Sequence, residues 1–329
     1  MVGGLALVSR PGCRGGRPFG PRLTATVALL SGGYRLSRRE TRQAVQDLWG
    51  VRVSLGGVVR QEQAQSAALA PVVEKARAAV QQAAVVNMDE TGWRQEKQQA
   101  WLWTAVTATL TVFRIDRTRS GAAVEALLGP DFRGVVGSDR WSAYNGFPAE
   151  RRALCYAHLK RAFQALVDRR REAAPIGCWG LAEIERLFAL WHRFRGGEYD
   201  RKELQRRLIP LQARLGRLLR CGQENPDHRA AGLCRELMKW WPALWTFARV
   251  EGVEPTNNGA ERALRPAVLW RKGSFGPDSE AGSLVAERLL TAIASCRQQS
   301  RPLLAFLAAA GEAALQGSAA PTLLATRLG

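Results

Sequence analysis

Residues 84–93, AVVNMDETGW, contain the apolar run that decides the fold. Its first five residues, 84–88, are typical of a buried strand, and this predicted strand ends at Asp89. The same pattern returns at residues 134–144, GVVGSDRWSAY, where residues 134–138 predict a second strand that ends at Asp139. Two strands that each end at an aspartate predict an α/β fold in which the two carboxylates can converge.

The surrounding segments continue the alternation of strand and helix. Residues 100–115 carry alternating apolar side chains over a length that fits two antiparallel strands, and residues 120–129 predict a short helix. Residues 154–157 predict a further strand that leads into a helix. Residues 172–250 are almost wholly helical in pattern, with leucines between positions 204 and 219 at three- and four-residue steps.

These patterns divide the chain into six parts. We predict a disordered or poorly packed N-terminus, a helical segment, the first part of a core, an all-helical insertion, the last part of the core with Glu261, and a C-terminal tail. Their ranges are 1–25, 26–83, 84–171, 172–250, 251–300 and 301–329.

The helical segment before the core has the pattern of a helix-turn-helix. Ser37 and Glu40 predict a capping box at the start of one helix, and Gly50 predicts its end. A turn over residues 51–54 then precedes a second helix. Four arginines of this segment are candidate phosphate contacts: Arg38, Arg39, Arg42 and Arg60. An ordinary helical hairpin has the same pattern, so DNA binding is one of two interpretations of this segment.

Three acidic residues are candidate metal ligands: Asp89, Asp139 and Glu261. Phosphodiester chemistry uses two divalent ions about 3.5–4 Å apart, and hard cations such as Mg²⁺ prefer carboxylates. Glu90 is a poor candidate, because successive side chains of a strand point to opposite faces. Each candidate also has a purely structural interpretation. The aspartates can be turn residues at strand ends, and Glu261 can form a capping box with Asn258.

Aromatic residues follow both aspartates closely. They are Trp93 after Asp89, and Trp141 and Tyr144 after Asp139. Exposed aromatic rings beside an acid can stack on an unpaired base. Glu261 and Arg265 are four residues apart on a predicted helix, so a metal ligand and a phosphate contact can share one helical face.

The net charge of +19 is concentrated in two blocks. Residues 1–80 and 151–250 are strongly basic, whereas residues 81–150 hold about as many acids as bases. A basic surface attracts phosphates and favours a nucleic-acid partner, although an arginine-rich composition also follows from GC-rich coding sequence.

The apolar residues and cysteines argue against membrane and secreted classes. No run of about 18 uncharged apolar residues is present, and the first 20 residues lack the charge order of a signal peptide, so we expect a cytoplasmic protein without a membrane span. Six scattered cysteines without a CxxC pair predict reduced thiols. Cys155 and His158 have the spacing of half a zinc site. Because no second half is evident, packing is the favoured interpretation.

Several motifs together resemble one known family. They are MDETGW at residues 88–93, GSDRWSAY at 137–144, CYAHLKRAF at 155–163 and TNNGAERALRPAVLWRKGSFG at 256–276. In order and spacing they resemble the transposase family of insertion sequence 66, of the DDE type, over roughly residues 28–310. The resemblance implies a ribonuclease-H-like core with a helical insertion between the second and third acids, preceded by a helix-turn-helix-like region. The family's catalytic triad carries over onto Asp89, Asp139 and Glu261.

The resemblance also implies an activity, cofactors and partners. It implies metal-dependent strand cleavage and strand transfer at insertion-sequence ends, with two Mg²⁺ or Mn²⁺ ions. The partners would be double-stranded DNA at the element's ends and target, further copies of the chain, and accessory proteins of the element, in a bacterial cytoplasm near the nucleoid. Trp141 is expected to stack on a displaced base. Four basic residues are expected to brace phosphates: Lys160, Arg161, Arg262 and Arg265.

Two rival interpretations are a catalytically inactive or truncated DNA-binding relic and another ribonuclease-H-like nuclease, such as a junction resolvase or an RNA–DNA hybrid nuclease. The relic is favoured by one departure from the family. Family members usually carry an N-terminal coiled stretch and a cysteine-rich zinc-binding module, whereas only Cys13 precedes the core here.

Overall fold

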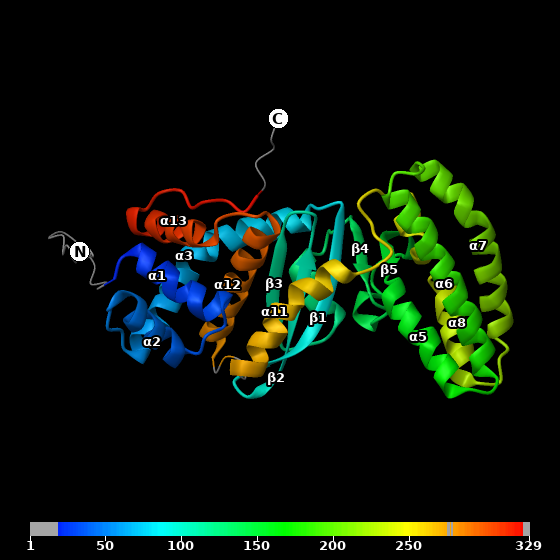
Figure 1. Cartoon of the computed structure of the whole chain (residues 1–329), viewed down its shortest axis with the longest axis horizontal. Coiled ribbons are helices and arrows are strands. Elements are labelled where there is room, and N and C mark those ends of the chain that lie inside the picture. The colour runs from blue at the N-terminus through cyan, green and yellow to red at the C-terminus, as the bar shows by residue number, and fades with distance from the viewer. Residues whose placement is uncertain (1–18, 275–276, 278, 325–329) are drawn as a thin grey trace.

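The chain has a mixed α/β fold built around one five-stranded sheet, as predicted (Figure 1). The structure is a computed structural model, and it describes residues 19–274, 277 and 279–324. In Figure 1 the sheet lies between the helices of the two chain ends on one side and a bundle of helices from the middle of the sequence on the other. None of the helices in this described part is long and apolar enough to span a bilayer.

The sheet has the strand order β3-β2-β1-β4-β5. Strands β1, β2 and β3 form an antiparallel meander, whereas β4 and β5 extend the sheet in parallel to β1. The two strands predicted within residues 100–115 are therefore β2 and β3. The strands span Val85–Gln95, Gln98–Val106, Thr111–Asp116, Val135–Ser138 and Arg152–Leu154.

Helices cover both faces of the sheet. The side chains of Val86 and Met88 pack with those of helices α3 and α4 on one face, and Trp93 packs with Leu264 of helix α11 on the other. This division follows from the alternation of side chains along β1. Asp89 is four residues before Trp93 on the same strand, so its side chain lies on the same face, the one covered by α11. These three helices span Leu55–Gln81, Gly121–Leu128 and Asn258–Ser274.

Helix α12 (Glu280–Gln298) closes the open edge of the sheet at β3. Its side chains at four-residue steps accept hydrogen bonds from the backbone of the edge strand. Ser295 Oγ, Thr291 Oγ1 and Glu287 Oε1 accept from successive outward-facing N–H groups of β3, at 3.0, 3.0 and 2.7 Å. The edge amides are thereby satisfied without another strand. Helix α11 continues to Ser274, and Ser279 caps α12.

Thr291→Val should destabilise the chain by about 1–3 kcal/mol, because the substitution preserves shape but leaves the buried N–H of Phe113 without an acceptor. Urea unfolding followed by circular dichroism measures this change. Thr26→Val is the matched control, since the Thr26 hydroxyl donates only to the Arg22 carbonyl of its own helix at an exposed position. Equal midpoints for both variants would contradict the role of Thr291 at this edge.

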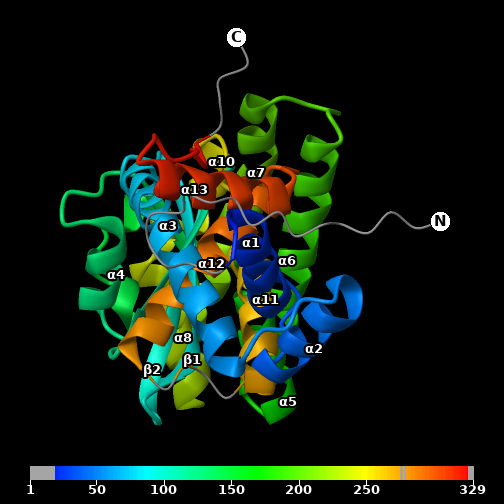
Figure 2. The same cartoon turned by 90° about the vertical axis from the view of Figure 1, so that its left-hand side faces the viewer.

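The first and last helices of the described residues pack together on the sheet's helical layer (Figure 2). Helix α1 (Pro21–Ala28) contacts both α3 and α13 (Leu303–Gln316), and Ala25 and Phe306 belong to one buried cluster. The approach is close: a Cβ added at Gly311 would lie 3.3 Å from Cβ of Pro21. The prediction of poor packing is therefore wrong for residues 21–25, while residues 1–18 lie outside the described residues. Helix α13, which lies within the predicted C-terminal tail, packs in the same layer against α1 and α3.

The helices of residues 172–250, the predicted insertion, pack together with α5, which was predicted as part of the core, in a bundle beyond β5 (Figure 1). The leucine stripe of α7 is buried in it, as the periodicity indicates. Helices α5 and α6 make an especially close contact, because Gly177 and Gly180 of α6 face Phe163 of α5. The helices α5 to α10 span Tyr156–Arg169, Ala173–Arg195, Arg201–Gly222, His228–Lys239, Trp241–Leu244 and Thr246–Arg249.

Gly177→Ala should cost about 1–3 kcal/mol, since the new Cβ would lie 2.6 Å from the Phe163 carbonyl oxygen and force α6 away from α5. Gly232→Ala in α8 is the matched helical control, because nothing lies within 4 Å of its Cβ position. The control should gain about 0.5–1 kcal/mol from helix propensity. Thermal melts of the two variants should move in opposite directions, and a stabilised Gly177→Ala would refute the close contact.

Candidate functional site

The parallel pairing of β1 with β4 brings the two candidate aspartates together. Asn87 lies opposite Gly137 in this pairing, so the same register continued by two residues places Asp89 beside Asp139 on one face. Both side chains are half-buried. The approach of the strands depends on Gly137, because a Cβ at this position would lie 2.3 Å from Asn87 Oδ1.

Only one of the aspartates lies where the sequence predicted it relative to its strand. Asp139 directly follows the end of β4. Asp89, in contrast, lies in the middle of β1, which continues to Gln95, and it is paired opposite Thr104 of β2. The hairpin partner β2 supports β1 well past the aspartate. The carboxylate therefore extends from the face of the sheet, and not from its end.

Glu261 reaches this face from the first turn of α11. The helix start is held by Asn257, a buried residue whose Nδ2 donates to the Met88 carbonyl at 2.6 Å and whose backbone N–H donates to Cys155 Sγ at 3.2 Å. Asn257 thus ties α11 to β1 and to the start of α5. The Glu261 carboxylate, which was also compatible with a capping role, accepts from Arg161 Nη2 at 3.4 Å.

The three carboxylates affect one another electrostatically. Burial, together with the negative charges of Glu90, Asp139 and Glu261, raises the pKa of Asp89 to about 7. The N–H of Glu90 donates to Asp89 Oδ1 at 2.9 Å and opposes the shift. Because each acid disfavours the charge of its neighbours, a bound divalent cation would remove a penalty that the metal-free protein carries.

Glu90 points away from this group, as the alternation along the strand predicts. It accepts from Tyr144 Oη at 2.6 Å and from Arg119 at 2.8 Å on the opposite face. The guanidinium of Arg119 in turn lies over the Trp141 ring, 3.9 Å from its centroid. Glu90 therefore has a structural role that supports Trp141 through Arg119, a residue that no sequence motif singled out.

Of the three aromatic residues that we expected to be exposed beside the acids, one is exposed. Trp141 is 36% exposed, whereas Trp93 and Tyr144 are buried. Both buried rings face apolar clusters, because Trp93 packs under α11 and Tyr144 packs against Trp103. The prediction of exposure is wrong for these two residues, and Trp141 alone is available to stack on a base.

A buried arginine holds the backbone at Asp139 through a hydrogen bond. Arg152 is 0% exposed, and its Nη2 donates to the Asp139 carbonyl at 2.9 Å while its guanidinium lies over the Trp240 ring at 4.4 Å. Burial lowers the pKa of Arg152 to about 10, although Asp139 opposes this shift. Sequence reasoning missed Arg152, because one arginine within a basic chain carries no signal of burial.

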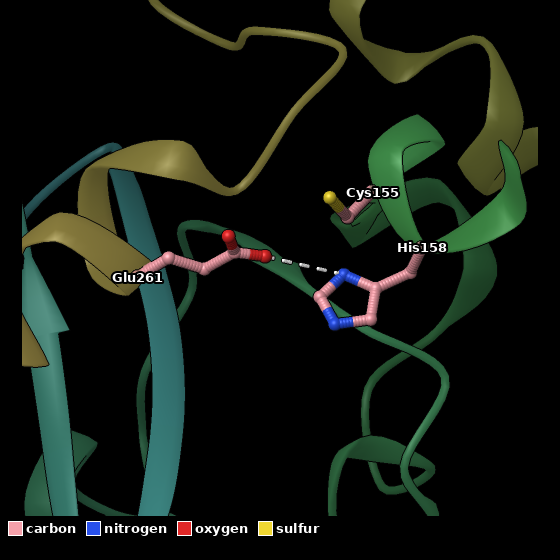
Figure 3. A group of neighbouring side chains, drawn as sticks. All are labelled: Cys155, His158 and Glu261. Carbon is pink, nitrogen blue, oxygen red and sulfur yellow. Dashed lines mark ion pairs between the residues drawn. The ribbon is translucent and has the colours of Figure 1, made fainter. Parts of the chain in front are cut away.

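Cys155 and His158 lie beside Glu261 (Figure 3). Cys155 precedes the first residue of α5 and His158 lies in its first turn. His158 Nδ1 is 3.5 Å from Glu261 Oε1, and one ligand atom from each of the three residues lies within 4.8 Å of the others. The sequence indicated half a zinc site without a partner. Glu261, 103 positions beyond His158 in the chain, is the neighbour that spacing did not predict.

The candidate DNA contacts lie on several exposed surfaces. On helix α2 (Arg38–Trp49) and the start of α3, the four arginines are exposed, but Arg38 Nε also donates to Glu62 at 3.0 Å. The capping box of Ser37 and Glu40 is present as predicted. On α5 and α11, Lys160 makes an ion pair with Glu185 at 3.9 Å. All four candidate residues of these two helices are exposed: Lys160, Arg161, Arg262 and Arg265.

The chain matches known proteins along most of its length. The family described as "Transposase IS66 family" matches residues 16–284. Two uncharacterized proteins of Sinorhizobium fredii, y4hP and y4qI, are each 26% identical to this chain over 320 and 223 residues. These matches cover 85% and 60% of the chain but only 56% and 41% of the relatives, so the chain spans about half the length of the curated relatives it matches. With more than half of its residues matched by the family, the chain belongs to the IS66 family of transposases.

Proposed function

We propose that this chain cuts and rejoins DNA at insertion-sequence ends as a DDE-type transposase, with Asp89, Asp139 and Glu261 as its metal ligands. The observation that carries the proposal is the parallel register that sets Asp89 beside Asp139, on the face from which Glu261 approaches. The mixed sheet, interrupted by a helical bundle between the second and third acids, supports a ribonuclease-H-like core over residues 84–171 and 251–300.

The donor set fits two hard cations. All three side chains offer carboxylate oxygens, which Mg²⁺ and Mn²⁺ prefer, and all three are half-buried. Burial, with the negative charges of Glu90, Asp139 and Glu261, raises the pKa of Asp89, and a cation bound beside this carboxylate would offset the cost of its charge. When bound, such a pair of ions would activate the attacking oxygen and stabilise the leaving oxygen of the phosphodiester.

The chain's own residues would hold the DNA. In this proposal Arg161, Arg262 and Arg265 brace phosphates beside the acids, together with Lys160, while Trp141 stacks on a displaced base. The rigidity of Trp141 is supported by its Nε1, which donates to the Arg119 carbonyl at 3.2 Å. Residues 26–83 would contact duplex DNA as a helix-turn-helix-like segment, and the chain would act as a homo-oligomer, with accessory proteins of the element, in the bacterial cytoplasm.

The proposal is tested by incubating the full chain with duplex DNA that carries the inverted repeats flanking its gene. We expect nicked ends with free 3′-hydroxyls and joined products in Mg²⁺ or Mn²⁺, and neither product in EDTA. Binding of the duplex without metal-dependent cleavage would identify a DNA-binding relic. Preferential cleavage of four-way junctions or RNA–DNA hybrids would instead identify another nuclease and overturn the proposed substrate.

A further inference from the structure

A second group of metal-binding atoms lies next to the proposed acid triad. Cys155 Sγ, His158 Nδ1 and a Glu261 carboxylate oxygen all lie within 4.8 Å of one another (Figure 3). We propose that Cys155, His158 and Glu261 bind a zinc-like cation at a site separate from that of Asp89 and Asp139, and that Glu261 is common to both sites. The consequence for DNA cleavage rests on the proposed function, whereas the binding of the cation does not.

The donor chemistry separates this site from the acid site. Sulfur, imidazole nitrogen and one carboxylate oxygen form a set that suits Zn²⁺ or Co²⁺, whereas Mg²⁺ prefers oxygen alone. Ligand atoms of a tetrahedral zinc lie about 3.4–3.6 Å apart, given the usual bond lengths. The 3.5 Å between His158 Nδ1 and Glu261 Oε1 already has this value. The distances from the sulfur to the other two ligand atoms are at most 4.8 Å and must shorten by at most about 1.4 Å, which rotation of the Glu261 and His158 side chains can supply.

The imidazole nitrogen is available for a cation. His158 Nδ1 is buried and makes no hydrogen bond to any residue of the described part of the chain. Burial, with the nearby charge of Arg161, lowers the pKa of His158 and favours the neutral ring that metal coordination requires. A buried nitrogen without a hydrogen bond carries a desolvation cost, which a metal bond would offset.

Local backbone groups offset part of the cost of a buried Cys155 thiolate. Burial raises the pKa of Cys155, but the backbone amides of Asn257, His158 and Ala157 stabilise the thiolate and oppose that shift. Cys155 also precedes α5, whose N-terminus favours negative charge. On coordination the S–H bond breaks, the proton passes to solvent buffer, and the sulfur lone pair forms the bond to the metal.

Sharing of Glu261 makes the two sites antagonistic. A zinc-like cation held between α5 and α11 would draw the Glu261 carboxylate toward His158, where its oxygen already lies. It would also displace Arg161, which now donates to that carboxylate. Glu261 would then be unavailable to the cations of Asp89 and Asp139. Zinc should therefore inhibit Mg²⁺-dependent cleavage without competing for the two aspartates.

Co²⁺ is the probe for the binding site, because a cobalt–thiolate bond gives a charge-transfer band in the near ultraviolet. Titration of the full chain should give a saturable band that Zn²⁺ abolishes. Cys155→Ser should remove the band, whereas Cys178→Ser, at an exposed cysteine of α6, should retain it. Asp89→Asn should also retain the band, because the aspartate belongs to the other site. A band that survives in Cys155→Ser, or one lost in Asp89→Asn, overturns the proposal.

Two further measurements keep the test decisive. If Cys155→Ser does not fold, His158→Ala and Glu261→Gln replace it, and each should weaken Co²⁺ binding at least about tenfold, as loss of a ligand does; unchanged affinity overturns the site. In the cleavage assay, each protein's rate is normalised to its own rate without Zn²⁺. The Zn²⁺ concentration that halves this rate should be at least about tenfold higher for Cys155→Ser than for the unmodified chain. Absence of all cleavage refutes the proposed function. Cleavage that requires Asp89, Asp139 and Glu261, in a protein that gives no cobalt band, refutes the zinc-like site alone.

Discussion

Asp139→Asn should lower Mg²⁺-dependent strand cleavage by at least about 10³-fold, because one charged ligand of the proposed cation site would be replaced by a weak neutral one. The substitution is conservative for the fold. Asp139 Oδ1 accepts the Trp141 N–H at 2.8 Å, and an asparagine oxygen can accept the same bond. Arg152 supports the loop through the Asp139 carbonyl, which the substitution does not change. The loss should therefore reflect chemistry and not misfolding.

The matched control for this variant is Asp131→Asn, which removes one negative charge from an exposed loop before β4. Single-turnover cleavage of end-labelled duplex measures the rate, and electrophoretic mobility shift measures DNA binding. Asp139→Asn should bind duplex at least as tightly as the unmodified chain, since it carries one negative charge fewer. Retention of cleavage in Asp139→Asn would remove Asp139 from the triad.

The sequence predicted those parts of the site that depend on local patterns. The strands before Asp89 and Asp139 are short apolar runs, and the capping box of Ser37 and Glu40 is a local motif with a fixed spacing. Each pattern depends on residues within one element, so it survives without knowledge of the tertiary contacts. The same holds for the leucine stripe of α7, whose period alone identifies a buried face.

The true length of β1 could not be predicted, because its hairpin turn lacks the usual signal. The turn residues Glu96 and Lys97 both adopt positive φ, at 54° and 61°, where glycine or asparagine is the common choice. With that signal missing, the polar residues after Asp89 resemble a loop. Pairing with β2 stabilises them as a strand instead, and the acid consequently lies in the middle of the strand.

Contacts between segments far apart in the chain could not be predicted from the sequence either. Glu261 approaches His158 only because buried Asn257 fixes the start of α11 against β1 and α5. Arg152 is buried only because Trp240, from the helical bundle, covers it. Such tertiary contacts override the ordinary expectation that an arginine is exposed, and no spacing within one element encodes them.

Asp89→Asn should make the metal-free protein more stable at pH 8 by on the order of 2–4 kcal/mol, while it abolishes cleavage. Burial and neighbouring acids raise the pKa of Asp89 to about 7 from its ordinary value of 3.8. A carboxyl whose pKa is raised by folding destabilises the folded state when it is charged. The penalty is absent below about pH 4, grows as the pH rises to about 7, and is constant above it. Asparagine carries no such charge, and its oxygen can still accept the Glu90 N–H.

Thermal melts in EDTA at pH 4 and pH 8 measure this difference. The two proteins should melt at similar temperatures at pH 4, and the variant should melt higher at pH 8. Mg²⁺ should then raise the melting temperature of the unmodified chain at pH 8 much more than that of the variant, because binding to the folded state stabilises it. The Mg²⁺ effect should weaken from pH 8 to pH 6, since protons compete for Asp89. A variant less stable than the unmodified chain in EDTA at pH 8 would show that burial and the neighbouring acids do not disfavour the charged form of Asp89.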